Sequence, residues 1–268
     1  MKLLVVTPTL GSSRWLKDTV ESVERFAPGS RQILVAPREK MEALRKEFPA
    51  VEVVPERGGG MYAAINDGVA AAGGAWDAFT YLNDDDVLGP NFAAATRLMS
   101  ATTGEGIVYG RVALIGAGGE SLGALSISPV PNLNRELWEQ RIEPLFQQGT
   151  LVNRAAWNRL AGFDETLRFC GDSEFLARAC VKGVQFQRAA GGPVAAFRLR
   201  AGQLTKNRTA MEAERKKVDE KLGLRAKRKQ GRHLLALMIF RVWNLPVYAG
   251  RVRRFGFVSF NEAMRRVE

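Results

Sequence analysis

The first 82 residues alternate between short apolar runs and segments in which apolar residues recur at helical spacing. The apolar runs occupy residues 2–7, 32–36, 51–54 and 78–82. The segments with helical spacing occupy residues 13–26, 39–48 and 62–72. Strands that alternate with helices at this pitch form parallel sheets with right-handed crossovers. The pattern therefore predicts an α/β fold in which helices flank a mostly parallel, Rossmann-like sheet.

Three polar segments fall where strands of this sheet are predicted to end. They are Thr7-Pro8-Thr9, the loop 56–60 and the segment 83–86. In open α/β sheets, ligands bind beyond the carboxyl ends of the strands. The position of these segments at one edge of the sheet predicts that they belong to one binding site.

The most distinctive of these segments is the acidic run Asp84-Asp85-Asp86, which follows an apolar strand. Carboxylates that emerge from a buried strand are unfavourable unless positive charge neutralises them. Hard oxygen ligands suit Mg²⁺ or Mn²⁺, which also bridge diphosphate oxygens. The run predicts a divalent metal site, and the alternative is a solvated acidic turn.

Two further features accompany the acidic run. The loop Glu56-Arg57-Gly58-Gly59-Gly60 precedes a predicted helix, so its backbone can approach an anionic ligand closely, although a flexible loop explains the glycines equally well. Asp172 lies just before a helix predicted over 173–182. It is either the N-cap of that helix or a general base, and a base would need a raised pKa.

The order of five segments resembles bacterial family-2 glycosyltransferases of the GT-A fold. They are Thr7-Pro8-Thr9, the stretch Tyr62 to Gly68, the stretch Leu82 to Asp86, Gly162-Phe163-Asp164-Glu165, and Asp172 followed by Arg178. The resemblance covers roughly residues 1–205. One departure is that the stretch 35–39, where the family usually carries an acidic cluster for the nucleotide base, offers only Glu39.

The resemblance implies an inverting transfer of a sugar from a nucleotide-sugar, with UDP the favoured nucleotide, to a hydroxyl of a glycan or lipid-linked acceptor in cell-surface polysaccharide or lipooligosaccharide synthesis. It implies Asp172 as the catalytic base. It implies donor contacts by Thr7, Pro8, Thr9, Arg57, Asn66, Asp84, Asp85 and Gln203. Mn²⁺ or Mg²⁺ would bind at Asp86 and Asp84, and Gln148 and Asp164 would line the acceptor side.

The charge of the chain is concentrated in its last quarter. Residues 1–197 hold 20 Lys/Arg against 22 Asp/Glu, whereas residues 198–268 hold 19 against 6. The charge predicts a nearly neutral catalytic or binding domain followed by a basic helical extension over 206–268, and the resemblance implies that the first part is a GT-A catalytic domain over 1–205. The apolar stretch 233–250 contains Arg241 and Pro246 and makes a poor transmembrane span.

Two roles for this tail stay open. It can lie on an anionic membrane surface through residues 225–268, or it can pack on the catalytic domain with its arginines solvated. No DNA- or RNA-binding motif accompanies the basic residues, so nucleic-acid binding is not expected. The first strand begins at Lys2 or Leu3 without room for a secretory signal. The expected location is cytoplasmic, with peripheral association at the inner face of the cell membrane.

The cysteines and the single histidine limit the kinds of catalysis that this chain can perform. Cys170 and Cys180 are expected to be reduced structural thiols, and His233 lies in a basic stretch, so a Ser-His-Asp triad is not expected. Carboxylates would then perform any acid–base step. Two other functions remain: a nucleotidyltransferase, whose glycine-rich basic loop is not matched by residues 9–14, and a non-enzymatic adaptor with an inactive GT-A-like domain.

Overall fold

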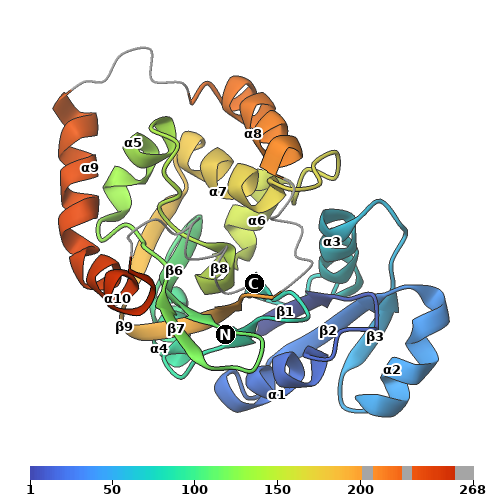
Figure 1. Ribbon diagram of the computed structural model, residues 1–268. Helices are drawn as coiled ribbons and strands as arrows, with labels where there is room; N and C mark the ends of the chain where they lie inside the picture. Colours follow the sequence, from blue (N-terminus) through green and yellow to red (C-terminus); the bar gives the residue numbers. More distant parts are fainter. Residues whose placement is uncertain (201–207, 225–230, 257–268) are drawn as a thin grey trace.

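The computed structural model describes residues 1–200, 208–224 and 231–256. Gln203, expected to contact the donor, and the basic residues of 225–230 lie outside this described part. The described residues form a nine-stranded sheet with helices on both faces (Figure 1). The predicted α/β class is confirmed.

The first part of the sheet is parallel and has the strand order β3-β2-β1-β4. Its strands are β1 Leu3–Pro8, β2 Arg31–Ala36, β3 Glu52–Pro55 and β4 Ala78–Tyr81. Its connecting helices are α1 Leu16–Phe26, α2 Met41–Glu47 and α3 Met61–Ala71, with a short 3-10 turn η1 Arg38–Lys40 before α2. Helix α3 approaches the sheet closely because residue 68 is glycine: a Cβ there would lie 2.5 Å from a methyl group of Val6.

The second part of the sheet mixes strand directions. Strand β8 (Thr150–Asn153) is antiparallel to β4, and β6 (Gly106–Ile115) follows it. The long strand β9 (Gln185–Arg198) is parallel to β6 and antiparallel to the short β5 (Val87–Leu88). Strand β7 (Ser121–Ala124) pairs with β6 outside this order. The pairing of β5 with β9 brings the end of β9 beside the acidic turn that precedes β5.

Alternate side chains of β1 face two different cores, as expected for a strand. Leu3 and Val5 pack with α1 and with α4 (Phe92–Ser100), whereas Leu4 and Val6 pack with α3. The core on the α3 side also includes helices α5 to α7. These are α5 Asn134–Glu139, α6 Arg154–Leu160 and α7 Gly171–Val181, with the 3-10 turns η2 Pro131–Leu133 and η3 Gln147–Gly149.

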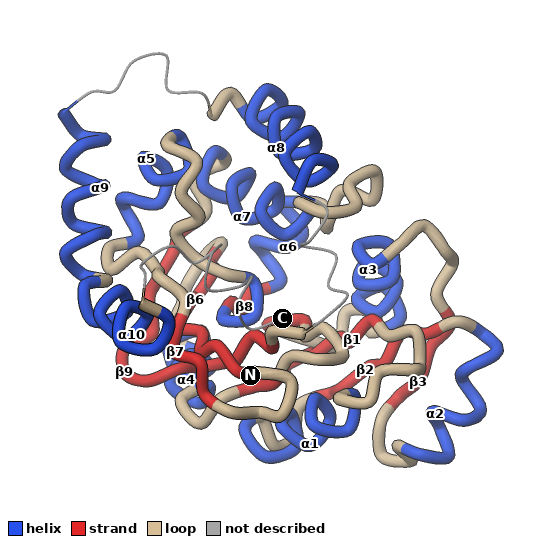
Figure 2. The backbone as a smooth tube through the Cα atoms, viewed as in Figure 1, coloured by secondary structure: helices blue, strands red, loops and turns tan. Residues whose placement is uncertain are grey.

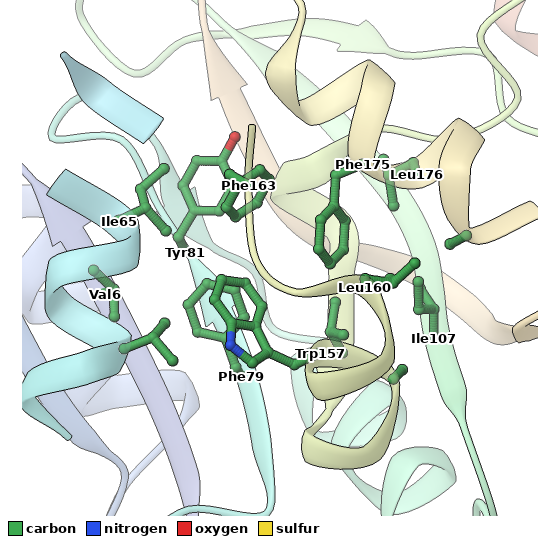
Figure 3. Close-up of a cluster of buried hydrophobic side chains, with 14 of the residues drawn as sticks. Val6, Ile65, Phe79, Tyr81, Ile107, Trp157, Leu160, Phe163, Phe175 and Leu176 are labelled. Carbon is green, nitrogen blue, oxygen red and sulfur yellow. The ribbon is translucent and has the colours of Figure 1, made fainter. Parts of the chain in front are cut away.

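An aromatic cluster ties α6 and α7 to the sheet (Figure 3). The Phe79 and Trp157 ring centroids lie 4.8 Å apart, and those of Phe163 and Phe175 lie 4.6 Å apart. Each such pair adds about 1 kcal/mol to the gain from burial. The cluster therefore fixes the position of α7, whose first turn carries Asp172.

The described part of the C-terminal region is helical, and its helices pack on the sheet domain (Figure 2). Its helices are α8 Arg208–Leu222, α9 Gly231–Trp243 and α10 Leu245–Phe255. Helix α8 contacts α7, α9 contacts α5, and α10 contacts β7. Across the residues with described structure, no helix is both long enough and apolar enough to span a bilayer.

Candidate active site

The acidic run forms a turn at the carboxyl end of β4, held against the loop that follows β1. The Thr9 hydroxyl donates a 2.6 Å hydrogen bond to the Asp84 carboxylate, and the Ser13 hydroxyl donates to the Asp84 carbonyl oxygen at 2.8 Å. Asp84 is partly exposed, whereas Asp85 and Asp86 are buried. Two of the segments singled out in the sequence therefore meet at one edge of the sheet.

Asp86 is the most enclosed carboxylate of the turn. Its two oxygens accept hydrogen bonds from the Arg198 backbone N–H at 3.0 Å, from the Gln148 side chain at 3.1 Å and from the Asn83 side chain at 3.1 Å. Burial, and then the charge of Asp85, raise the pKa of Asp86 to about 8. The structure thus brings Gln148, which was expected on the acceptor side, into contact with the acidic turn, and its acceptor role stays a prediction.

Two arginines add positive charge to this turn: Arg198 is the last residue of β9, and Arg200 follows the strand. The buried Arg198 side chain donates to the Asp85 carbonyl oxygen at 2.8 Å and to the Asp18 carboxylate at 2.9 Å. Arg200 forms an ion pair with the Asp85 carboxylate. These arginines already offset part of the cost of burying the Asp85 and Asp86 carboxylates, so burial alone does not require a metal ion here.

Asp172 lies in the first turn of α7 but does not cap it. The helix begins at Gly171, and the N-cap residue Cys170 makes no side-chain capping bond. The Asp172 carboxylate instead accepts from the Tyr62 hydroxyl at 3.2 Å and from the Ser173 backbone N–H at 2.8 Å. Residue 171 must be small, since a Cβ there would lie 2.6 Å from the Tyr62 ring.

The surroundings of Asp172 raise its pKa towards the neutral range, although the carboxylate is still mostly ionised at pH 7. Burial, and then the charge of Glu143, raise the pKa of Asp172 to about 6. Glu143 is held nearby by a hydrogen bond from the Ser173 hydroxyl. A carboxyl group with this pKa can act as a general base close to physiological pH. Glu143 belongs to no sequence motif and was not predicted.

Tyr81 connects Asp172 with the acidic turn. Burial raises the pKa of Tyr81 well above its usual value, and the charges of Asp172, Tyr62 and Asp86 raise it further. A small cavity beside Asp172 is lined by Tyr81 and by Gln147. The buried Gln147 amide makes no side-chain hydrogen bond within the described structure, and the adjacent Gln148 reaches Asp86.

The predicted donor residues of the glycine-rich loop and α3 are held by their own partners. The Asn66 amide donates to the Phe163 carbonyl oxygen at 3.0 Å and to Glu165 at 2.9 Å, and it accepts from the Phe163 N–H at 3.0 Å. Arg57 forms ion pairs with Asp67 and Glu165. These contacts fasten α3 to the 163–165 loop, which gives both residues a structural role.

The backbone of the glycine-rich loop explains its composition. Gly58, Gly59 and Gly60 have φ angles of 87°, 104° and 97°, a region that other residues rarely adopt. The end of β1 is also tightly enclosed: Thr7 and Pro8 are buried, and the Thr7 hydroxyl has no hydrogen-bond partner within the described structure. Thr9 is therefore the residue of this segment with a direct contact to the acidic turn.

Asp164, expected on the acceptor side, is paired with helix α8. Its carboxylate accepts from Lys221 at 2.7 Å and from the Thr166 hydroxyl at 2.6 Å. Burial opposes ionisation, but Lys221 and Thr166 outweigh it and lower the pKa of Asp164 to about 2. Asp164 is therefore ionised throughout the neutral range and is not a second candidate for a general base.

Helix α8 also supports the loop that leads into Asp172. The Glu214 carboxylate accepts backbone N–H groups from Arg168 at 2.7 Å, Phe169 at 2.6 Å and Cys170 at 2.7 Å. Because the three donors would lose a charged acceptor, we expect Glu214→Ala to lower the free energy of unfolding by about 2 kcal/mol. Urea denaturation measures this, with Glu220→Ala, at an exposed position of the same helix, as the control. Equal stability of the two variants would contradict this role.

The described residues contain no group of three or more His, Cys, Asp or Glu side chains arranged to hold a metal ion. The chemistry of the acidic turn nevertheless fits a hard divalent cation. Asp84 offers a partly exposed carboxylate bonded to one hydroxyl, whereas Asp86 would have to exchange one of its amide donors for the ion. Metal binding at Asp84 and Asp86 therefore stays a prediction.

The fold agrees with solved structures of S. aureus TarS, a glycosyltransferase. The structure of its residues 1–349 with UDP-GlcNAc matches with a TM-score of 0.64 and 13% identity over 100% of this chain and 79% of that one. The complex of TarS residues 1–349 with UDP matches with a TM-score of 0.62 and 14% identity, over 98% of this chain and 77% of that one. The fold is GT-A-like.

The chain covers 46% of a longer TarS structure. No family model and no curated protein matches the sequence. The membership of family 2 that the motifs predicted therefore stays a prediction. At 13–14% identity the similarity to TarS establishes the fold of this chain, whereas its function depends on the residues of the site.

Proposed function

We propose that this chain is an inverting glycosyltransferase that moves a sugar from a nucleotide-sugar, with a UDP-sugar favoured, to a hydroxyl of a glycan or lipid-linked acceptor. One observation carries the proposal: Asp172 lines a small cavity together with Tyr81, the last residue of β4, and the acidic turn follows this strand at one edge of a GT-A-like sheet. The complexes of the neighbour TarS with UDP and with UDP-GlcNAc support a uridine nucleotide.

In the proposed reaction, ionised Asp172 accepts the proton of the acceptor hydroxyl as that oxygen attacks the anomeric carbon. The new C–O bond forms on the face opposite the bond between the anomeric carbon and the diphosphate. That bond breaks, and the nucleoside diphosphate leaves with the bonding electron pair. A Mn²⁺ or Mg²⁺ ion at Asp84 and Asp86 would stabilise the charge on that leaving group. Arg198 and Arg200 hold the turn in place beside the leaving group.

The donor would occupy the side of the site formed by Thr9 and the acidic turn, where the hydrogen bond from Thr9 to Asp84 joins the two segments. The acceptor would enter on the side of Asp172, where Gln147 and Tyr81 line the small cavity. Direct donor contacts by Thr7, Pro8, Arg57 and Asn66 remain part of the proposal because the resemblance to family-2 glycosyltransferases implies them.

The pKa of Asp172 predicts a pH dependence with a defined sign. Because the ionised carboxylate is the base, kcat/KM should fall as pH decreases through about 6. The Glu143 charge raises this pKa and the Tyr62 hydrogen bond lowers it, so Glu143→Gln should move the acidic limb to lower pH and Tyr62→Phe to higher pH. Opposite displacements in the pH profiles of the two variants are the expected result. Two profiles that coincide with the wild type would contradict the assignment of Asp172.

The direct test is release of the nucleoside diphosphate from a panel of UDP-sugars, with glycan or lipid-linked acceptors and with Mn²⁺, Mg²⁺ or EDTA. We expect acceptor-dependent UDP release from one donor. Pyrophosphate release from a nucleoside triphosphate and a sugar phosphate would indicate a nucleotidyltransferase instead. If Asp86→Asn and Asp172→Asn both keep full function in cells, the adaptor hypothesis would be favoured.

A further inference from the structure

The outward face of helices α9 and α10 is apolar and exposed. Its large side chains, here called the apolar strip, are exposed by 45–60%. They are Leu234, Met238, Val242, Leu245 and Val252, and Leu235 lies beside them at 49%. Figure 1 shows α9 at the outer edge of the molecule, with α5 on its inner side. Single exposed apolar residues are ordinary, but Leu234, Met238 and Val242 recur every four residues and form a row on one face of α9, which marks an interaction surface.

The opposite face of α9 is fixed to the domain. His233, Ala236 and Phe240 are buried, and the last two pack against Leu137 of α5. The His233 ring lies 2.7 Å from a carboxylate oxygen of Glu139. Helix α9 is therefore apolar on two sides, and within the described structure only the inner side is covered. A helix that is apolar all round normally has a partner on every side.

The corner between α9 and α10 is also anchored, so the strip is held in a defined orientation. The Asn244 side chain donates to the Ile127 carbonyl oxygen at 2.9 Å and accepts from the Ile127 N–H at 3.2 Å. Arg188 and Arg111 lie over the Trp243 ring, at 5.1 and 5.7 Å from its centroid. Trp243 therefore serves the contact with the sheet and is not counted in the apolar strip.

The charged side chains of α9 and α10 are all arginines. Residues 231–256 contain five arginines and neither aspartate nor glutamate. Arg251 is buried and donates to the Ala124 carbonyl oxygen, whereas the other four are exposed. These exposed residues are Arg232, Arg241, Arg253 and Arg254. Exposed arginines beside exposed apolar side chains complement a surface that is anionic and apolar at once.

We propose that this face of α9 and α10 docks on an anionic lipid membrane, with the apolar strip in the interface and the four exposed arginines at the headgroups. Helix α9 has 13 residues and suits a position in the plane of the membrane, since a span needs about 20. Arginines near an anionic surface add to the attraction between helix and membrane. The docking does not depend on sugar transfer.

Flotation of the full chain with lipid vesicles tests the proposal without any nucleotide. The vesicles contain either phosphatidylcholine alone or phosphatidylcholine with phosphatidylglycerol. The apolar variant is Leu234→Gln/Met238→Gln/Val242→Gln, and the charge variant is Arg232→Gln/Arg241→Gln/Arg253→Gln/Arg254→Gln. The control is Arg25→Gln/Arg97→Gln, at exposed arginines of α1 and α4.

We expect the wild type and the control to bind anionic vesicles and to bind neutral vesicles at least about tenfold more weakly. Both test variants should lose about tenfold or more of the anionic binding, although their circular dichroism stays unchanged. Equal binding to the two vesicle types, or full binding by the apolar variant, would overturn the proposal. So would a wild-type dimer that the apolar variant converts to a monomer in light scattering, because the strip would then contact a second copy.

Discussion

Asp172→Asn is expected to lower kcat for sugar transfer about a thousandfold, within the range for loss of a general base. The amide has almost the same shape and still accepts the bonds from Tyr62 and Ser173, so the fold and the site geometry should persist. It cannot take a proton from the acceptor hydroxyl. Nucleotide affinity should change by less than about threefold, because the interaction that is lost occurs mainly in the transition state.

The matched control is Asp77→Asn. Asp77 directly precedes β4 and therefore lies at the opposite end of this strand from the acidic turn, where its carboxylate accepts from the Lys2 N–H. The Asp77→Asn variant should have the same kcat as the wild type. A residual kcat within about tenfold of the wild type in Asp172→Asn would remove Asp172 from the role of base.

Arg198→Met is expected to lower the free energy of unfolding by about 3 kcal/mol. Arg198 is 2% exposed and donates to carbonyl oxygens of the acidic turn and of residues 116 and 117. Methionine fills much of the same volume but leaves those oxygens, and the Asp18 carboxylate, without this cationic donor. Chemical denaturation monitored by fluorescence measures the change.

Arg97→Met is the control for this substitution, because Arg97 is an exposed arginine of α4. Its effect should stay within about 0.5 kcal/mol. If Arg198→Met were equally mild, the acidic turn would not depend on the arginine for its stability. The case for a metal ion as the main source of positive charge would then become stronger.

The parallel part of the fold could be predicted from the sequence because its information is local. The apolar run at 2–7 became β1, and the helical spacing over 62–72 became α3. Strand β9 was not predicted, since Arg188 and the Gly191-Gly192-Pro193 segment interrupt its apolar pattern. Its position depends on pairing with β5 and β6, strands far away in the chain.

The residues of the candidate site also fall into those that local sequence predicts and those that it does not. Asp172 and the acidic run were found because each lies beside a predicted helix or strand. Glu143, Arg198 and Glu214 were missed, although they control the charge or the position of those carboxylates. Glu143 and Glu214 lie about 30–45 residues from the Asp172 region, and Arg198 lies more than 100 from the acidic turn. No spacing rule connects residues at such separations, and only the folded chain brings them together.

The central claim is that the edge of the sheet at the acidic turn binds a nucleotide-sugar, and thermal unfolding with UDP, GDP, dTDP, CDP or ADP tests it most directly. Each nucleotide is added with Mn²⁺ or with EDTA, to the wild type and to Asp86→Asn. A ligand at about 100 times its Kd stabilises the folded state by about 2.7 kcal/mol, which raises Tm by several degrees. We predict such a rise for UDP with Mn²⁺, reduced by EDTA and absent in Asp86→Asn. A well-folded wild type whose Tm no nucleotide changes would contradict the proposed function.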